Sequence, residues 1–325
     1  MFIGVRRGPW RVLAAAAVML LASSCSGAGS SNGSSGTDSI TIGALPVVDD
    51  VSLYIAAQEG IFQQYGLNVT LKPVASSVVG IPMMKSGAIN ILGGGNYVSF
   101  VGQATQTPAS PPFKIIAEGA TCTPGSMEVL ALPSSGIQRP ADLAHKTIAV
   151  NIPNNIQTLT INSVLTADDV NPSTVKYAVI SFPKMAAALK AHKVDAISAV
   201  EPFATAAEQS LGAQPILDEC SGPTSNIPLS GYFSTAAWAQ QNPDAVSRFQ
   251  KAVSQAQEVA DTNRSVVEKT LRSYVKGLTP VESGTISLEQ FPTSTDSVQL
   301  DRISDLMKEA GLLRGSLVAS ALIQG

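Results

Sequence analysis

Val69-Thr-Leu-Lys-Pro-Val74 and Val175-Lys-Tyr-Ala-Val-Ile180 both alternate apolar and polar residues, as a half-buried β-strand does. They stand about 106 residues apart in the chain. Other stretches match at nearly the same offset: Ile42-Gly-Ala-Leu45 with Ile148-Ala-Val-Asn151, and Met84 to Ile91 with Leu189 to Ile197. The chain therefore contains a weak internal repeat of about fifty residues.

Helical patterns lie between the first two strands of each copy, over residues 51–62 and about 156–166. Each copy is thus predicted to run β-α-β-α-β. A strand, a crossover helix and a parallel strand form a right-handed unit that covers a sheet face. We therefore expect an α/β protein of two lobes, each with its own sheet and flanking helices.

Loops at the carboxyl ends of such strands are where open α/β sheets collect ligands. Three loops follow the strands of each copy, and the two sets would face each other across a cleft between the lobes. They are residues 46–52, 75–79 and 93–97 in the first copy, and 151–158, 181–185 and 200–203 in the second.

The N-terminus has the pattern of an exported bacterial lipoprotein. Arginines at 6, 7 and 11 flank a short apolar run that ends in small residues directly before Cys25. This run is too short to span a bilayer, so we expect residues 1–24 to be cleaved and Cys25 to carry lipid. An ordinary secretory peptide is the alternative, because Ala22 stands where the usual cleavage box has Leu.

Residues 25–39 are almost wholly Ser, Gly and other small or polar residues, which predicts a flexible tether to the membrane. The whole chain has a formal charge of −3, and removal of residues 1–24, with three arginines and no acid, would leave about −6. A net negative charge argues against nucleic acid as a partner.

Several ordered motifs resemble one protein family. They are Leu53-Tyr-Ile-Ala-Ala-Gln-Glu-Gly-Ile-Phe62, Tyr65-Gly-Leu-Asn-Val-Thr-Leu71, Pro140-Ala-Asp-Leu-Ala-His-Lys-Thr-Ile-Ala-Val150, Ala187-Ala-Leu-Lys-Ala-His-Lys-Val-Asp-Ala196 and Glu201-Pro-Phe203. Their order and spacing resemble the solute-binding proteins of ABC importers for aliphatic sulfonates, nitrate, taurine and thiamine pyrimidine precursors. The resemblance covers nearly the whole chain after the tether.

This resemblance implies a type II periplasmic-binding-protein fold that closes on a small solute and delivers it to a membrane permease. Lobe 1 would hold residues 40–133 and 229–325, and lobe 2 residues 134–228. The hinge strands would be residues 128–132 and about 229–235. It implies a monomer in the cell envelope, outside the cytoplasm, with no cofactor.

The loop before the second-lobe helix holds five candidate ligand contacts: Asn151, Asn154, Asn155, Gln157 and Thr158. Free amide hydrogens at a helix start, with side-chain amides beside them, can hold a sulfonate, nitrate or carboxylate without a cationic residue. A single Asn there could equally be a helix cap.

The first lobe offers Val48, Asp49, Asp50 and Ser52 in its first loop, Ser76 and Ser77 in its second, and Gly94, Gly95 and Asn96 in its third. The two aspartates could cap a helix, or, like Glu201, accept hydrogen bonds from an amino or pyrimidine group. Such acids would disfavour a purely anionic solute. Tyr232, on the expected returning hinge strand, could contact the solute or belong to the core.

Catalytic motifs are missing from the sequence: it has no G-x-S-x-G elbow, no Walker loop and no H-E-x-x-H. His145 and His192 have no partners at metal-ligand spacing. Enzymes with this fold exist, and so could a lipoprotein that senses a solute for a membrane kinase, but a binding protein for uptake is the main hypothesis.

Cys122 and Cys220 are the cysteines left when Cys25 is used for lipid. An oxidising compartment favours a bridge between them, and both come shortly before an expected hinge strand. We therefore predict a disulfide in the hinge region.

Overall fold

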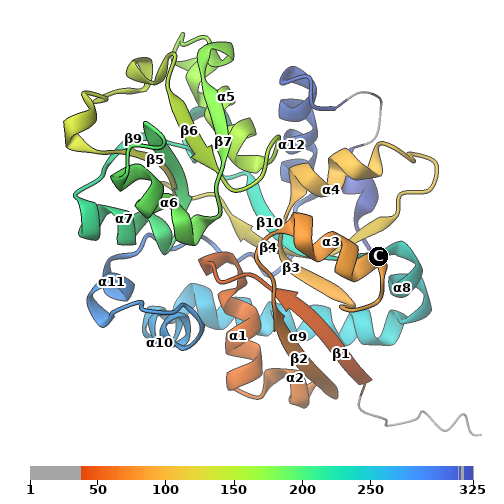
Figure 1. Cartoon of the computed structure of the whole chain (residues 1–325). Coiled ribbons are helices and arrows are strands. Elements are labelled where there is room, and N and C mark those ends of the chain that lie inside the picture. The colour runs from red at the N-terminus through yellow and green to blue at the C-terminus, as the bar shows by residue number, and fades with distance from the viewer. Residues whose placement is uncertain (1–37, 314, 316–317, 325) are drawn as a thin grey trace, which may run out of the picture. The chain divides into compact units, whose positions relative to one another are not determined.

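The computed structural model describes residues 38–313, 315 and 318–324. The expected signal peptide, the lipidation site Cys25 and most of the expected tether lie outside these residues. The strands are β1 (Asp38–Ala44), β2 (Leu67–Pro73), β3 (Ile91–Asn96), β4 (Phe113–Thr121), β5 (Met127–Ala131), β6 (Thr147–Val150), β7 (Lys176–Val179), β8 (Ala196–Val200), β9 (Gln214–Asp218) and β10 (Pro228–Thr235) (Figure 1).

The α-helices follow the apolar patterns of the sequence. They are α1 (Val51–Gln58), α2 (Ile61–Gln64), α3 (Ser77–Lys85), α4 (Tyr97–Ala104), α5 (Ile156–Ala167), α6 (Phe182–Lys190), α7 (Phe203–Leu211), α8 (Ala236–Gln241), α9 (Pro243–Thr262), α10 (Arg264–Tyr274), α11 (Pro280–Thr285) and α12 (Ser297–Glu309). The expected helix 51–62 is broken at Gly60, whose φ of 70° favours glycine and ends the helical run.

Two five-stranded sheets carry the fold, in the orders β2-β1-β3-β10-β4 and β7-β6-β8-β5-β9. β1 pairs in parallel with β2 and β3, and β6 pairs in parallel with β7 and β8. The strands of the repeat thus take the same order in both sheets. The expected two-lobed α/β fold is confirmed, and we call the sheets with their helices the first and second lobes.

The expected hinge strands are wrong. β5 pairs along its length with β8 and β9 in the second sheet, although residues up to 133 were assigned to the first lobe. β10 pairs with β3 and β4 in the first sheet. Both strands are apolar and buried, and an apolar run does not tell which sheet it enters. The chain crosses between sheets earlier, over residues 122–126 and 219–227.

Cys122 and Cys220 form a disulfide with a Cα–Cα distance of 5.3 Å. Each cysteine lies in one of the two crossing segments. The covalent bond therefore joins the outgoing and returning chain where they pass between the sheets.

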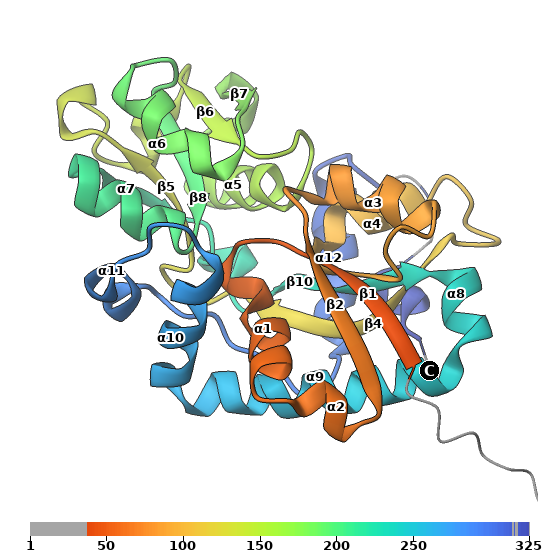
Figure 2. The same ribbon diagram turned by 60° about the horizontal axis from the view of Figure 1, so that its bottom comes forward.

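After β10 the chain returns to the first lobe, where α9 and α10 pack against α1 (Figure 2). Phe249 on α9 packs against Phe62, with ring centroids 6.2 Å apart, and Tyr274 on α10 stacks on Tyr54 at 3.7 Å. No helix in the described part of the chain is both long and apolar enough to cross a membrane.

Candidate functional site

A cleft of about 460 Å³, counting the space at its mouth, lies between loops of both lobes. Each of the six loops that follow the repeated strands contributes at least one residue. The lining residues are Leu45, Val47, Asp49, Ser77, Gly94, Asn96, Met127, Asn151, Asn155, Ile156, Gln157, Phe182, Val200, Leu229 and Ser230. Seven of the candidate residues meet here: Asp49, Ser77, Gly94, Asn96, Asn151, Asn155 and Gln157.

The second-lobe wall of the cleft consists of amide groups that are hydrogen-bonded to one another. Asn155 caps α5 and donates from Nδ2 to Asn151 Oδ1 at 2.7 Å and to Gln157 Oε1 at 3.1 Å. Gln157 Oε1 also accepts the Asn151 backbone N–H at 2.8 Å. The side chains of Asn155 and Gln157 are thus committed to the wall itself, so they fix its shape.

The start of α5 supplies the free donors of this wall. Ile156 and Gln157 both line the cleft and stand in the first turn, where backbone N–H groups have no partner within the helix. The positive end of the helix dipole lies at the same place. This wall can therefore bind an anionic or strongly accepting group without a cationic side chain.

A buried network of hydrogen bonds fixes the side chain of Gln157. Its Nε2 donates to the carbonyl and the hydroxyl oxygens of Ser198, and Ser198 donates to Glu219 Oε1. Thr160 donates to the other oxygen of Glu219 at 2.7 Å. Burial raises the pKa of Glu219 to about 8, although the hydrogen bonds from Ser198 and Thr160 oppose this rise.

The first-lobe wall of the cleft is formed by polar side chains and by the backbone at Gly94. Asn96 caps α4 by accepting the Ser99 N–H at 2.9 Å, and its Nδ2 faces Ser77 Oγ at 3.4 Å. Gly94 has a φ of 59°, and a Cβ there would lie 3.0 Å from Asp50 Oδ2. Only glycine fits this position, and it keeps the wall open to a solute.

Asp49 is the ionisable side chain of the cleft lining, which contains no Lys, Arg or His. Burial raises the pKa of its carboxyl, while the nearby Ser230 hydroxyl opposes this rise. Ser230 also lines the cleft, and its buried hydroxyl has no hydrogen-bond partner of good geometry among the described residues. This corner of the cleft is polar, acidic and open to a donor group from a solute.

The other candidate residues lie outside the cleft lining. Gly95 packs under the Phe233 ring, Asn154 is exposed in a left-handed turn, and Ser76 precedes α3 without a capping hydrogen bond. Thr158 turns back to donate to the Asn155 carbonyl at 2.9 Å. The sequence pattern placed all of these at loop ends but could not tell which way each side chain points.

Four further candidates are buried in the first lobe or at the contact between lobes. The Val48 N–H donates to the Glu201 carbonyl at 3.2 Å, which ties the lobes together. Asp50 accepts the Leu45 N–H at 2.6 Å, and Ser52 and Tyr232 lie fully buried.

Glu201 is also buried, and its carboxylate links α7 to the segment around Ser287. Its carboxylate accepts the backbone N–H groups of Thr205, at 3.1 Å, and Ser287, at 2.9 Å, and the Thr205 hydroxyl at 2.8 Å. With its oxygens occupied in this way, it anchors the chain near the cleft.

Sequence reasoning named none of the remaining lining residues individually: Leu45, Val47, Met127, Ile156, Phe182, Val200, Leu229 and Ser230. Val47, Ile156, Phe182 and Val200 do lie in the expected cleft loops. Seven of the eight are apolar, and the sequence pattern alone predicts that such residues belong to the core. Ser230 offered a signal, since a Ser-Gly pair interrupts an otherwise apolar strand. No cluster of His, Cys, Asp and Glu suited to a metal ion occurs in the part of the chain that the structure describes.

The model of the NMT1-like family matches residues 33–272, nearly three quarters of the sequence. The chain belongs to the NMT1-like family. A comparison with curated protein sequences finds no match.

Solved structures of sulfonate- and nitrate-binding proteins share this fold. The alkanesulfonate-binding protein SsuA from Xanthomonas axonopodis pv. citri, bound to MOPS, aligns with a TM-score of 0.74 at 17% identity, over 89% of this chain and 99% of that one. The periplasmic nitrate-binding protein NrtA from Synechocystis PCC 6803 aligns with a TM-score of 0.71 at 18% identity, over 88% and 84%. The desulfurization enzyme DSZB also aligns, with a TM-score of 0.65 at 17% identity, over 88% and 96%.

Proposed function

We propose that this NMT1-like protein is the extracytoplasmic solute-binding lipoprotein of an ABC importer. Solved structures with its fold include binding proteins for alkanesulfonates and nitrate. The cleft lining supports binding rather than catalysis, because its one ionisable side chain, Asp49, has no Cys, His or Lys beside it in the lining. The protein would act as a monomer and deliver its solute to a membrane permease.

The solute is proposed to be small and polar, with an accepting group at one end and a donor at the other. The free N–H groups of Ile156 and Gln157 fit a sulfonate or a similar anionic group. Asp49 and Ser230 on the facing wall fit an amino group. Taurine carries both groups, so within the sulfonate and nitrate class we favour taurine-like compounds over nitrate and simple sulfonates.

Asp49 also favours the second candidate, a thiamine pyrimidine precursor or another amino compound. An aminopyrimidine presents ring acceptors to the α5 wall and an exocyclic amine to Asp49. A role as a ligand-sensing lipoprotein would use the same cleft. Enzymatic activity, which the likeness to DSZB raises, is the weaker alternative, because the cleft lining holds no Cys, His or Lys.

A thermal-shift screen tests the solute class. A solute that binds only the folded protein raises the melting temperature with its concentration. We expect a shift with taurine or an aminopyrimidine and a smaller or absent shift with nitrate and ethanesulfonate. A shift with nitrate that survives Asp49→Asn would place the protein with the binders of simple anions.

Lipidation of Cys25 is proposed from the N-terminal pattern alone. A Cys25→Ala precursor should lose acyl labelling and remain uncleaved in cells. Normal cleavage of this variant would indicate an ordinary secretory signal instead.

A further inference from the structure

Residues 286–290 form a short segment that is hydrogen-bonded to the start of the outgoing crossing, at Thr121 and Thr123, and we call this segment the strap. Four hydrogen bonds fix its backbone. They join Arg264 to the Ile286 carbonyl at 2.9 Å, Ser287 N–H to Glu201 at 2.9 Å, Thr123 to the Leu288 carbonyl at 2.8 Å and Thr121 N–H to the Gln290 carbonyl at 3.0 Å. The strap is therefore held by α10, by the end of β4, by the outgoing crossing segment and by the second lobe.

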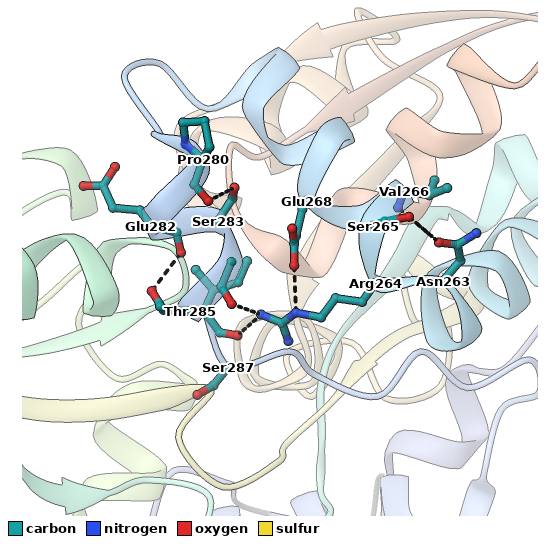
Figure 3. Close-up of polar contacts among 12 residues, drawn as sticks. Asn263, Arg264, Ser265, Val266, Glu268, Pro280, Glu282, Ser283, Thr285 and Ser287 are labelled. Carbon is teal, nitrogen blue, oxygen red and sulfur yellow. Dashed lines mark hydrogen bonds and ion pairs between the residues drawn. The ribbon is translucent and has the colours of Figure 1, made fainter.

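Arg264 sets where the strap begins. Figure 3 shows its guanidinium group beside Glu268, which it contacts at 2.8 Å. The same group donates to the carbonyl oxygens of Gly284 and Ile286, at 3.0 and 2.9 Å. One planar guanidinium group binds two carbonyl groups at the end of α11, so the chain leaves this helix in a defined direction.

Glu289, near the end of the strap, points into the protein. Its side chain is buried, and no N–H or O–H group of the described residues donates to either of its carboxyl oxygens. The polar group within hydrogen-bond reach is the carboxyl of Asp49, the acid of the cleft lining.

Among the residues that the structure describes, no Lys, Arg or His is found to act on this carboxyl pair. The titratable groups that face it from the neighbouring elements are acids or phenols: Asp50 before α1, Glu201 after β8, Tyr232 on β10 and Tyr274 on α10. Two carboxylates in contact without a cation cannot both be ionised in a buried site. One proton must lie between them.

We propose that Glu289 holds this proton and donates it to Asp49, so that Asp49 remains the charged acceptor that selects a solute with an amino group. Glu289 is then a specificity-determining residue that does not itself line the cleft. The choice between solutes rests on the proposed binding function, whereas the position of the proton does not.

The geometry distinguishes the two acids. Asp49 has the Ser230 hydroxyl beside it and an opening to the cleft, so its charge can be solvated or met by a solute. Glu289 has neither, and the neutral form of a carboxyl is favoured where nothing can solvate the charge. Burial accordingly holds the pKa of Glu289 well above its usual range.

Carbon-13 NMR of carboxyl-labelled whole protein tests the proton's position without any solute. Spectra of Glu289→Gln and Asp49→Asn assign the two signals. We expect the Glu289 signal to be that of a protonated acid at pH 7 and the Asp49 signal that of a carboxylate. An ionised Glu289 at pH 7 would overturn the proposal.

A variant pair then tests the donated hydrogen bond. Glu289→Gln keeps an N–H donor, so Asp49 should titrate near its wild-type midpoint, whereas Glu289→Leu should raise this midpoint by a pH unit or more. Glu118→Gln, a buried acid of the first lobe outside the cleft lining, should leave it unchanged. If Glu289→Leu does not fold, Glu289→Met takes its place. The proposal is contradicted if the Asp49 midpoint rises as far in Glu289→Gln as in Glu289→Met.

Taurine and ethanesulfonate, which differ by one amine, test selection. Wild type should bind taurine at least tenfold more tightly at pH 7, and Asp49→Asn should lose this preference. If neither compound binds, the proposed function is wrong in its solute class while the NMR result still decides the proton. If ethanesulfonate binds as well as taurine to wild type, the role of Glu289 in selection is refuted.

Discussion

Gln157 donates from Nε2 to both oxygens of Ser198, the carbonyl at 2.7 Å and the hydroxyl at 2.8 Å. The same hydroxyl donates to Glu219 at 2.5 Å, and Glu219 directly precedes the disulfide residue Cys220. A continuous polar network therefore runs from the cleft wall to the crossing between the lobes. A displacement of Gln157 relative to Glu219 would break buried hydrogen bonds of this network.

The first prediction concerns this network. Gln157→Leu should lower the free energy of unfolding by about 2 kcal/mol or more, because it removes the donor to the two Ser198 oxygens and the acceptor of the Asn151 N–H. It should also weaken solute binding, since the wall loses its shape. Urea unfolding and titration of the solute measure both effects. The exposed Gln209, which bonds only Thr285 at 2.9 Å, provides the control Gln209→Leu, and equal losses in both variants would contradict the role of the network.

The second prediction concerns pH and stability. The pKa of Glu219 rises from 4.5 to about 8 on folding, so between these values the folded protein holds more protons than the unfolded chain. Stability is then highest at or below the lower value and falls as pH rises through this window, by up to about 1.4 kcal/mol per pH unit for one group. Glu118, with a pKa of about 7, acts in the same direction.

Urea unfolding at pH 5, 6, 7 and 8 measures this dependence. Glu219→Gln keeps the shape and removes the titration, so its stability should change less steeply with pH than that of wild type. A wild-type stability that rises from pH 5 to 8 would show that these acids are ionised in the folded protein.

The third prediction concerns the disulfide. It closes a loop with a sequence separation of 98 residues, so its loss should cost up to about 4 to 5 kcal/mol in the chain-entropy model. Unfolding of the wild type with and without reductant measures the cost, and the double variant Cys122→Ser with Cys220→Ser should be insensitive to reductant. Thiol counting in denaturant without reductant should find neither cysteine free. Two free thiols in protein from the cell envelope would contradict the bridge.

The fourth prediction concerns Arg264. Arg264→Ala frees the carbonyls of Gly284 and Ile286, so the strap should loosen, with a loss of about 1 to 3 kcal/mol. Hydrogen exchange should increase at the Ser287 N–H, which donates to Glu201. Arg139→Ala, which removes an exposed pair with Asp142 at 3.5 Å, is the control and should cost less than about 1 kcal/mol. Unchanged exchange at Ser287 would mean that Arg264 does not hold the strap.

The repeated strands could be predicted from sequence because period-two alternation and crossover helices at a constant offset leave few topologies. The cleft loops followed from strand order, since carboxyl ends of parallel strands meet at one edge. Within these loops the side-chain directions could not be predicted. Asn154 and Asn155 are neighbours of the same type, yet one is exposed in a left-handed turn and the other caps α5.

Glu289 shows what sequence patterns cannot reveal. It lies about 240 residues from Asp49 in the chain, in a segment without periodicity, and is brought to Asp49 by the strap, which Arg264 and Glu201 help to fix. The crossing segments were misplaced for a related reason. The apolar strands β5 and β10 enter different sheets because of long-range pairing, which local propensity does not encode.

The most direct test of the account is a titration of wild type and Asn151→Asp with the solute that stabilises the protein most. Asn151 Oδ1 accepts the Asn155 amide at 2.7 Å, and Asp can keep this bond while it adds a negative charge beside the first turn of α5. Asn171→Asp is the matched control, because Asn171 is an exposed helix cap that Asp can replace. The account predicts one site per chain, at least tenfold weaker binding in Asn151→Asp and unchanged binding in Asn171→Asp. Equal affinity in all three proteins, or no saturable binding of any sulfonate, nitrate, pyrimidine or amino compound, would contradict it.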